Sequence, residues 1–514
     1  MFVRKRIIIE IVLVSVFIGL SLYISFNKSL WRDEAFSYLL ANESYREIVT
    51  ISAQDFNPPV FYILLKSWIH MLGTDVMVMR LLPLLFSIAT VWILIRLKDW
   101  IFQSSGVLTN FNDSSNSGLL FSLIFSGVYY LLIISSNVFL YFSAELRPYS
   151  LLILLVLLSS LLLIRLLNHF SWKICVWFGV VQVILVYTHT MGTLWVFSQA
   201  LATGFYLVLS GKWTLVKPLL ITYGSVFALT FPWLLVMIEQ NGRAMADFWI
   251  TFDKETALSE YIGIFVGMER IVELDAYDVY IQLFDYSKFL LFAGLLYVYE
   301  RVKSLKVVGF AAVVMSLVVY YYSYLVNPIL YSRYLSLMAV IGVVGLFLGF
   351  VFVIKIVDVV VRSMVGRHTI WSSVVSLIVL AGSSGLYFST IIQTLPDLLD
   401  ELNRTNYKFL HSYSNLAIYT NEELDVMSCV YYAQNCTYVG DLSTTLGYVG
   451  VHQFDSVAYI ENWDVIDDEW IGVVYKNYRE DEVVPELEAR AYQIVERQFL
   501  GDNSYFALAR IVQN

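Results

Sequence analysis

The chain has 514 residues, of which 58% are hydrophobic, 16% aromatic and only 15% charged. Its mean hydropathy is +0.68. Because soluble globular proteins carry about a quarter charged residues, this composition excludes an ordinary soluble protein and predicts a polytopic membrane protein. The apolar runs are as long as helices and lack the alternation of barrel strands, so the expected spans are α-helical.

The charge is unevenly distributed along the chain. Residues 393–514 hold 20 acidic and 7 basic side chains, a net charge of −13, whereas the whole chain carries −9 and the other 392 residues therefore carry +4. The acidic balance thus belongs to a C-terminal segment. It gives no reason to expect nucleic acid as a partner.

The N-terminus combines basic residues with a long apolar run. Arg4, Lys5 and Arg6 precede the run 7–26, which is long enough to cross a bilayer. It lacks the small-residue cleavage site of a signal peptide. Since cytoplasmic loops are enriched in Lys and Arg, the N-terminus is placed in the cytoplasm and the first helix leads outward.

The next apolar stretch, 58–72, is short and carries Lys66 and His70. As a span it would place Arg96 and Lys98 on the wrong side, so we interpret it as an amphipathic helix on the outer surface. The inner loops are then all basic, and about eleven spans are expected. The predicted spans are 7–26, 75–95, 118–136, 148–166, 174–189, 191–210, 218–238, 287–300, 307–326, 335–354 and 371–392.

This topology predicts a membrane domain, 1–392, and a small extracytoplasmic α/β domain, 393–514. The membrane domain has two long outer loops, 27–74 and 239–286. In the C-terminal domain, Asn421 is the expected N-cap of a helix whose first turn is acidic. The other predicted elements are strands at 416–420, 457–460, 471–475 and 505–512 and a helix at 485–492.

Three cysteines occur in the chain. Cys429 and Cys436 lie seven residues apart in the C-terminal domain, where either a local disulfide or two unrelated thiols fits the sequence. Cys175 lies in a predicted span and is expected to be a buried thiol. No zinc-type spacing of Cys or His occurs, so no structural metal site is predicted.

Ionisable and aromatic side chains gather at the outer ends of the predicted spans. Such groups at a membrane usually pair or line a functional cavity. Carboxylates there can act as general bases, and arginines can bind phosphate bidentately. These residue types suit a reaction between a lipid phosphate and a hydroxyl group. The candidates are Arg32, Asp33, Glu34, Asp55 and Asn57 in the first loop, and Glu145, Arg147, Tyr149, His189, Arg333 and Tyr334 in later ones.

Each candidate has a simpler interpretation when taken alone. Juxtamembrane arginines commonly extend to lipid headgroups, and tyrosines near span ends usually form interfacial belts. A lone histidine such as His189 is more often structural than catalytic, and Asp33 and Glu34 alone fit solvated loop charge. The functional interpretation depends on the combination and on its position at one face.

Five short motifs occur in order over about residues 1–340 and together resemble GT-C glycosyltransferases related to protein O-mannosyltransferases and lipid A aminoarabinose transferases. Asn57 stands where that family usually has histidine, which leaves no histidine for a role at this point. The motifs are W-R-D-E-A at 31–35, N-P-P-V-F-Y-I-L-L at 57–65, E-L-R-P-Y at 145–149, Y-T-H at 187–189 and S-R-Y-L at 332–335.

The resemblance implies a GT-C fold and a polyprenyl- or dolichyl-phosphate sugar as donor. Transfer would occur on the outer or lumenal face with inversion at the anomeric carbon. Asp33 would accept the proton of the acceptor hydroxyl, and Glu34 would orient the acceptor or Asp33. Arg147 and Arg333 would stabilise the departing lipid phosphate, and His189 would hydrogen-bond the sugar or phosphate.

The remaining candidates receive supporting roles by the same resemblance. Glu145, Tyr149 and Tyr334 are assigned to the donor side, and Arg32, Asp55 and Asn57 to the acceptor side. Segment 58–72 would cap the cavity and loop 239–286 would admit the acceptor. No cofactor is expected with certainty, and a divalent metal stays open.

The sequence therefore predicts a membrane glycosyltransferase whose acceptor is a protein, lipid or glycan. A prokaryotic plasma membrane is preferred over the endoplasmic reticulum. A transporter or flippase of a lipid-linked substrate is the first alternative, although it predicts inverted repeats that the sequence lacks. The second is a membrane-anchored sensor or adhesin with residues 393–514 as its working part.

Overall fold

The computed structural model describes residues 2–105, 116–247, 305–365, 407–421, 423–433, 435–439, 454, 458–460, 462–466, 468–501 and 504–512. The chain divides into two compact units. The first comprises Met1–Leu22, Pro83–Ala144 and Pro148–Leu398, and the second comprises Tyr23–Leu82, Glu145–Arg147 and Leu399–Asn514.

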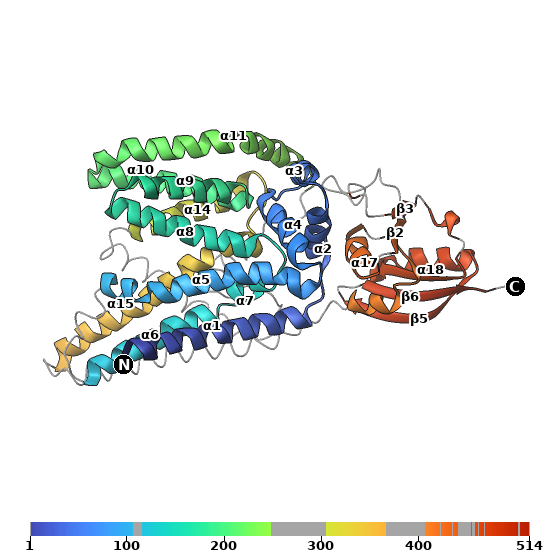
Figure 1. The fold of residues 1–514 in the computed structure, drawn as a ribbon, viewed down its shortest axis with the longest axis horizontal. Helices are drawn as coiled ribbons and strands as arrows, with labels where there is room; N and C mark the ends of the chain where they lie inside the picture. The colour runs from blue at the N-terminus through green and yellow to red at the C-terminus, as the bar shows by residue number, and fades with distance from the viewer. Residues whose placement is uncertain are drawn as a thin grey trace. The chain divides into compact units, whose positions relative to one another are not determined.

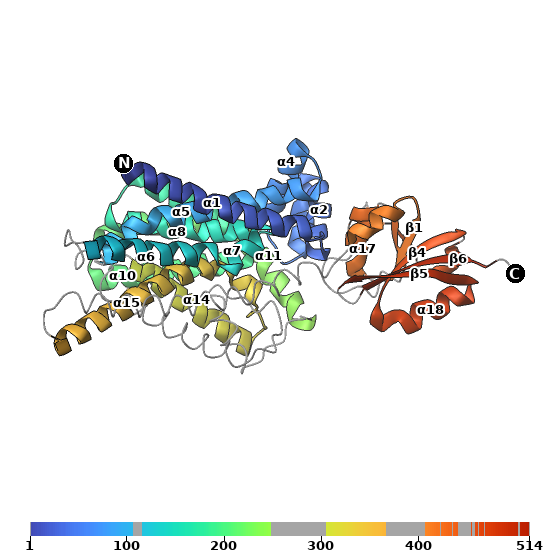
Figure 2. The same cartoon turned by 90° about the horizontal axis from the view of Figure 1, so that it is seen from below.

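The first unit is built from helices that run roughly parallel to one another (Figures 1 and 2). Two of them, α1 and α5, continue into the second unit. The α-helices are α1 (Phe2–Asn27), α5 (Val76–Ser105), α6 (Asn116–Ile134), α7 (Asn137–Ser143), α8 (Tyr149–Asn168), α9 (Trp172–Val186), α10 (Thr190–Ser210), α11 (Val216–Asp247), α14 (Leu305–Leu325) and α15 (Ala339–Val365). The short 3-10 helices are η1 (Trp213–Leu215) and η2 (Ser332–Met338).

Within the described residues, seven helices are long and apolar enough to cross a membrane, with mean hydropathies from 1.3 to 2.7. They coincide with the predicted spans 7–26, 75–95, 148–166, 191–210, 218–238, 307–326 and 335–354. The protein is thus an integral, multi-pass, α-helical membrane protein. The predicted spans 287–300 and 371–392 and most of loop 239–286 lie outside the described residues.

Two predicted spans differ in detail from the expectation. The span at 118–136 is a bent pair, because α6 ends at Ile134 and α7 follows at an angle of 40°. The break falls at Ser135 and Ser136, and Ser135 donates its hydroxyl to the carbonyl of Leu131. Serine side chains that bond the preceding turn in this way often bend helices. The span at 174–189 is the shorter helix α9.

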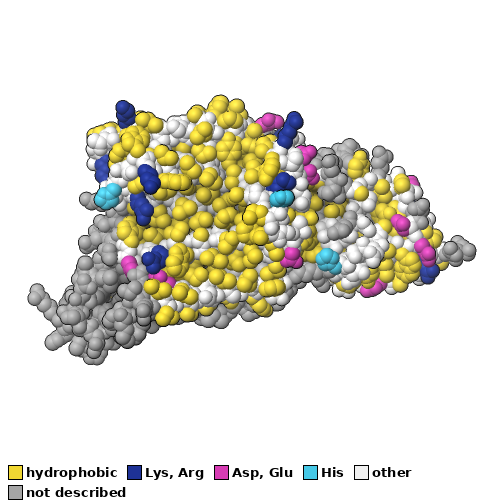
Figure 3. Space-filling model, viewed as in Figure 1, with side chains coloured by type: hydrophobic (Ala, Val, Ile, Leu, Met, Phe, Trp, Pro, Cys, Tyr) yellow, Lys and Arg dark blue, Asp and Glu magenta, His cyan; other side chains and the backbone are white. Residues whose placement is uncertain are grey.

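Exposed apolar side chains cover the outer surface of these helices. Val176 and Trp177 of α9, Phe205 of α10 and Leu229 of α11 are each more than half exposed. Figure 3 shows this apolar surface over the helices, with lysine and arginine side chains gathered toward the helix ends. A soluble protein rarely exposes so large an apolar surface, so this surface is suited to contact with lipid.

The second unit begins with three short helices after α1: α2 (Arg32–Asn42), α3 (Tyr45–Gln54) and α4 (Val60–Leu72). Ser44 and Glu47 form a capping box at the start of α3. The amphipathic helix predicted at 58–72 is α4, which starts after Pro59. Its buried side chains recur at helical spacing and include Tyr62, whose ring packs edge-on against Phe36 of α2.

The C-terminal part of the second unit is an α/β fold around a six-stranded sheet in the order β3-β2-β1-β4-β6-β5. Strands β3, β2, β1 and β4 pair in parallel, whereas β6 is antiparallel to β4 and β5. The strands are β1 (Ala417–Thr420), β2 (Cys436–Val439), β3 (Ala458–Ile460), β4 (Trp470–Lys476), β5 (Tyr492–Gly501) and β6 (Ser504–Ile511). The helices are η3 (Tyr407–Tyr413), α17 (Glu423–Ala433), η6 (Trp463–Val465), η7 (Asn477–Arg479) and α18 (Glu480–Ala489).

The two faces of this sheet are covered by different elements (Figure 2). On one face, Val483 and Leu487 of α18 pack with alternate residues of β4 such as Val473. On the other face, Gly472 lies so close to Phe506 that an added Cβ would be 2.6 Å from its ring. Phe506 in turn packs against Tyr413 of η3. A side chain at position 472 would therefore displace this aromatic packing.

The structure confirms the predicted C-terminal α/β fold but corrects some elements. The predicted helix at 485–492 begins earlier, at Glu480, and Pro485 lies inside it. The three acidic residues at 480–482 form its first turn, where the helix dipole favours them. Tyr492, the last residue of the predicted helix, is instead the first residue of β5. Neither β2 nor β5 was predicted as a strand.

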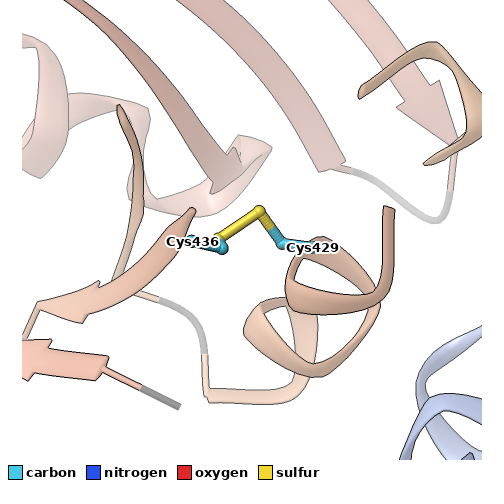
Figure 4. The surroundings of a disulfide bond; sticks show 2 residues. All are labelled: Cys429 and Cys436. Carbon is cyan, nitrogen blue, oxygen red and sulfur yellow. A yellow bond between two sulfur atoms is a disulfide. The ribbon is translucent and has the colours of Figure 1, made fainter. Parts of the chain in front are cut away.

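Cys429 and Cys436 form a disulfide, with their Cα atoms 5.8 Å apart. The bond joins α17 to the first residue of β2 (Figure 4). It closes a short segment that contains Tyr431 and Tyr432. Cys175 is a buried free thiol, as expected for a cysteine within the helical region.

Candidate functional site

The two adjacent carboxylates of the first loop start helix α2 but occupy different environments. Trp31 is the N-cap, and its backbone N–H donates a hydrogen bond to Glu34 Oε2 at 3.4 Å. The side chain of Asp33 is 29% exposed, whereas that of Glu34 is 0% exposed. Asp33 is thus accessible to a substrate, and Glu34 is part of the protein interior.

Glu34 is held by a buried, two-pronged ion pair. Arg80 Nε donates to Glu34 Oε1 at 3.0 Å, and Arg80 Nη2 donates to Oε2 at 2.6 Å. The backbone N–H of Leu146 also donates to Oε1 at 2.8 Å. Burial by itself would raise the pKa of Glu34, but the charges of Arg80 and Lys28 and these hydrogen bonds hold it below its ordinary value. Glu34 therefore stays ionised at neutral pH.

Arg80 uses every guanidinium N–H in this region. Besides the two bonds to Glu34, it donates to the carbonyls of Ser25, Lys28 and Ser29 at 2.7 to 2.9 Å. These carbonyls belong to the end of α1 and the turn that follows it. Arg80 consequently ties the end of α1 to the start of α2.

The short segment 145–147 lies against these two elements within the same unit. Lys28 Nζ is 4.0 Å from Glu145 Oε2, and both side chains are buried. Arg147 Nη1 lies 3.3 Å from the carbonyl oxygen of Asp33, to which it donates. It also donates to Tyr62 Oη at 3.5 Å. A buried guanidinium is thereby placed next to the backbone of the accessible Asp33.

A second carboxyl, Asp55, belongs to the same group. It caps the end of α3, and its Oδ2 accepts from the backbone N–H and the side-chain amide of Asn57 at 3.3 and 3.2 Å. Burial raises the pKa of Asp55, and the nearby charge of Arg147 opposes this increase. Burial also raises the pKa of the Tyr62 hydroxyl. Asp33, Asp55, Tyr62 and Arg147, which we call the acid–arginine cluster, thus act on one another electrostatically.

Arg32 lies at the edge of the acid–arginine cluster. Its Nε is 3.6 Å from Asp33 Oδ1, and its guanidinium carbon is 5.8 Å from the centre of the Trp31 ring. Both charged side chains are partly exposed. An exposed ion pair of this kind contributes little to stability, which leaves the Asp33 carboxylate able to exchange partners.

A separate group in the first unit is aromatic. The ring of His189 lies between those of Tyr149 and Tyr334, at centroid distances of 5.4 and 5.8 Å. We call these three residues the aromatic–histidine cluster. They come from the starts of α8 and α10 and from η2.

His189 has a defined structural role as the N-cap of α10. Its Nδ1 accepts from the backbone N–H of Met191 at 3.1 Å, so a neutral imidazole carries its proton on Nε2. Gly192 permits this tight turn, because an added Cβ there would be 2.3 Å from the Leu185 carbonyl oxygen. Arg333, in η2, places its guanidinium carbon 5.9 Å from the Tyr331 ring centre.

The structure thus divides the predicted site residues into two groups. Those of the second unit are Arg32, Asp33, Glu34, Asp55, Asn57, Glu145 and Arg147, and those of the first are Tyr149, His189, Arg333 and Tyr334. The sequence interpretation missed Lys28, Tyr62 and Arg80. A charged residue such as Arg80 inside an apolar helix is itself a signal, because such a residue normally has a buried partner. Across the described ranges, no group of three His, Cys, Asp or Glu could hold a metal ion.

The fold defines the class of the protein as a multi-pass helical membrane protein with a small C-terminal α/β domain. No family model and no curated protein matches the sequence. The structure resembles ArnT from Cupriavidus metallidurans in the apo state, with a TM-score of 0.54, 12% identity and coverage of 96% of this chain and 97% of that one. ArnT bound to undecaprenyl phosphate gives a TM-score of 0.55 at 11% identity, with 97% of both chains covered. At such low identity, the likeness shows a shared fold over nearly the whole chain.

Proposed function

We propose that this protein is a GT-C-type glycosyltransferase that uses a polyprenyl- or dolichyl-phosphate sugar as donor and an acceptor hydroxyl on the extracytoplasmic face. One observation carries the proposal: the buried guanidinium of Arg147 donates to the backbone carbonyl of Asp33, the residue whose carboxylate is accessible. The fold shared with ArnT, one of whose structures contains undecaprenyl phosphate, supports the donor class.

In the proposed reaction, Asp33 accepts the proton of the acceptor hydroxyl as the oxygen attacks the anomeric carbon. The bond between that carbon and the phosphate oxygen breaks, and the configuration inverts. The phosphate departs with the lipid and carries the electron pair of the broken bond. Arg147 stabilises its charge as it develops, which is the largest electrostatic requirement of such a reaction.

Glu34 is proposed to orient Asp33 rather than to touch the acceptor. It is buried between Arg80 and the backbone of Leu146. Through these contacts it supports both the start of α2, which carries Asp33, and the segment that carries Arg147. Its contribution to the reaction would therefore be indirect.

The other predicted residues keep the roles that their motifs suggest. We propose that Arg333 and His189 serve the donor phosphate and sugar, with Glu145, Tyr149 and Tyr334, and that Arg32, Asp55 and Asn57 serve the acceptor side. The acceptor would be a protein, lipid or glycan. The enzyme itself would lie in a prokaryotic plasma membrane. The Cys429–Cys436 disulfide supports an oxidising, extracytoplasmic location for the C-terminal domain.

The test compares Asp33→Asn with Asp464→Asn in full-length protein in lipid nanodiscs. The probes are undecaprenyl-phosphate sugars carrying mannose, aminoarabinose or galactose, with host membranes as the acceptor source. We expect Asp33→Asn to lower the release of undecaprenyl phosphate by roughly 100-fold or more. Asp464 is a matched control because it also pairs with an arginine, in the C-terminal domain.

Two results would contradict the proposal. Near-normal turnover of folded Asp33→Asn would exclude Asp33 as the base. Movement of a lipid-linked sugar across the bilayer without its consumption by the wild-type protein would favour a transporter.

A further inference from the structure

The turn that precedes Asp33 is held from both sides within the second unit. On one side, Arg80 binds the carbonyls of Lys28 and Ser29. On the other, the backbone N–H of Leu30 donates to the hydroxyl of Tyr432 at 2.6 Å. Tyr432 belongs to α17 of the C-terminal α/β fold, 402 positions away in sequence. A distant element therefore satisfies a buried backbone group three residues before Asp33.

Further contacts fix α17 against the helices of the first loop. Tyr431 donates its hydroxyl to the carbonyl of Thr74 at 3.0 Å. Its ring also packs edge-on against Tyr38 of α2, with the ring centres 4.9 Å apart. The Cys429–Cys436 disulfide closes the segment that carries both tyrosines. The hydroxyl of Tyr432 therefore belongs to a helix that these contacts and the disulfide hold in place.

We propose that Tyr432 is a positioning residue for the Asp33 carboxylate, so that the C-terminal domain takes part in forming the site. The proposal rests on the glycosyltransferase function given above. The buried Leu30 N–H donates to the hydroxyl of Tyr432. Without that hydroxyl the amide must either find water or stay unsatisfied, and an unsatisfied buried amide is costly. Removing the hydroxyl therefore favours displacement of the turn, and with it of Trp31 and Asp33.

The first measurement is kinetic and compares Tyr432→Phe with Tyr419→Phe. Both substitutions remove one hydroxyl from the α/β fold, but the hydroxyl of Tyr419 donates to Asp468 within that fold. We expect Tyr432→Phe to lower kcat roughly tenfold, because small displacements of a reacting group slow catalysis strongly. The KM for the undecaprenyl-phosphate sugar should change little, and Tyr419→Phe should retain wild-type kcat. Equal kcat values for the two variants, per folded protein, would overturn the proposal.

A double-mutant cycle separates positioning from a general loss of structure. If Tyr432 acts through Asp33, adding Tyr432→Phe to Asp33→Asn should cause no further loss of the remaining activity. A full multiplicative loss in the double variant would show that Tyr432 acts independently of Asp33. The proposal would then be wrong even though both single variants are impaired.

Hydrogen exchange makes the inference distinguishable from the proposed function. In Tyr432→Phe, the amides of Leu30 and Trp31 should exchange faster than in the wild type, whatever reaction the protein catalyses. Unchanged exchange in Tyr432→Phe overturns the positioning role. Faster exchange in Tyr432→Phe, together with a wild-type protein that transfers no sugar, overturns only the proposed function. If Tyr432→Phe fails to fold, Cys429→Ser combined with Cys436→Ser keeps the hydroxyl but removes its brace. That variant should show faster exchange than the wild type at the same two amides, and no increase would overturn the proposal.

Discussion

The acid–arginine cluster of the second unit and the aromatic–histidine cluster of the first are stabilised by different forces. Around Arg147, charged groups lie close to one another, and the adjoining Glu34–Arg80 pair is fully buried. Around His189, the contacts are between rings, and one hydrogen bond caps a helix. Removing one charge from the region around Arg147 leaves another charge without compensation. A substitution in the aromatic–histidine cluster leaves no such charge. The two regions should therefore respond differently to mutation.

The largest expected effect comes from breaking the buried ion pair. Arg80→Ala leaves Glu34 buried without its partner and removes five hydrogen bonds. We expect a loss of about 3 to 5 kcal/mol in the free energy of unfolding. Arg479→Ala removes an exposed partner of Glu482 and should cost about 0 to 1 kcal/mol. Chemical denaturation in detergent would measure both, and similar losses would contradict the distinction.

The next effect concerns use of the donor. Arg147→Ala should reduce kcat/KM for an undecaprenyl-phosphate sugar by roughly 100-fold, because it removes the charge proposed to stabilise the departing phosphate. Arg147→Lys should restore only part of this, since an ammonium does not reproduce the planar fork of a guanidinium.

The control for Arg147 is Arg46→Ala, an exposed arginine of α3 in the same unit. It should leave both the folded yield and kcat/KM unchanged. If Arg147→Ala lowered activity only in proportion to its folded yield, the role of Arg147 would be structural, and the acid–arginine cluster would not act on the donor phosphate.

A smaller effect separates the two properties of His189. His189→Ala removes the cap of α10 and should cost about 1 kcal/mol of stability. His189→Asn keeps a capping side chain but removes the ring between Tyr149 and Tyr334. We expect its stability to lie closer to the wild type while sugar transfer still falls. Wild-type transfer by His189→Asn would restrict His189 to capping.

The smallest effect is on the pH dependence of stability. The pKa of Glu34 in the folded state is lowered from its ordinary value of 4.5, so its stabilisation is present above that pH. It is lost as the pH falls below that value toward the lowered pKa. The raised pKa of Asp55 has the opposite sign, since its contribution is present below its ordinary value of 3.8 and is lost as the pH rises through the raised value.

Melting experiments between about pH 3 and pH 7 would test these signs. Asp55→Asn should gain stability relative to the wild type as the pH rises. Glu34→Gln should be less stable at neutral pH and should lose the acid-side slope that Glu34 contributes. A steeper acid-side slope in Glu34→Gln would contradict the assigned pKa shift.

Many elements of the fold could be predicted because their signals are local. Apolar runs predicted the spans that α1, α5, α8 and α10 form, and a short apolar stretch that carries Lys66 and His70 predicted α4. Strands β2 and β5 were both missed, and β5 is a polar-rich edge strand that lacks a continuous apolar run. Helix α18 begins at its acidic first turn, five residues before Pro485, where the prediction had placed its start.

The candidate site was predictable only in its composition. Sequence motifs identified Asp33, Glu34 and Arg147, but no local pattern pairs Glu34 with Arg80, which lies 46 positions later. Nor could sequence assign different environments to two adjacent carboxylates. Their side chains project from neighbouring positions of one helix, and the elements packed around α2 decide which of them is buried.

The sequence by itself thus determined that this is a multi-pass helical membrane protein with an acidic C-terminal α/β domain. Hydropathy and charge are sums over neighbouring residues, and they need no knowledge of the fold. Only the tertiary structure decided that Glu34 is buried on Arg80, that Asp33 is accessible beside Arg147, and that Tyr432 supports the turn before them. These are contacts between distant segments, and their geometry depends on how the chain packs rather than on the order of its residues.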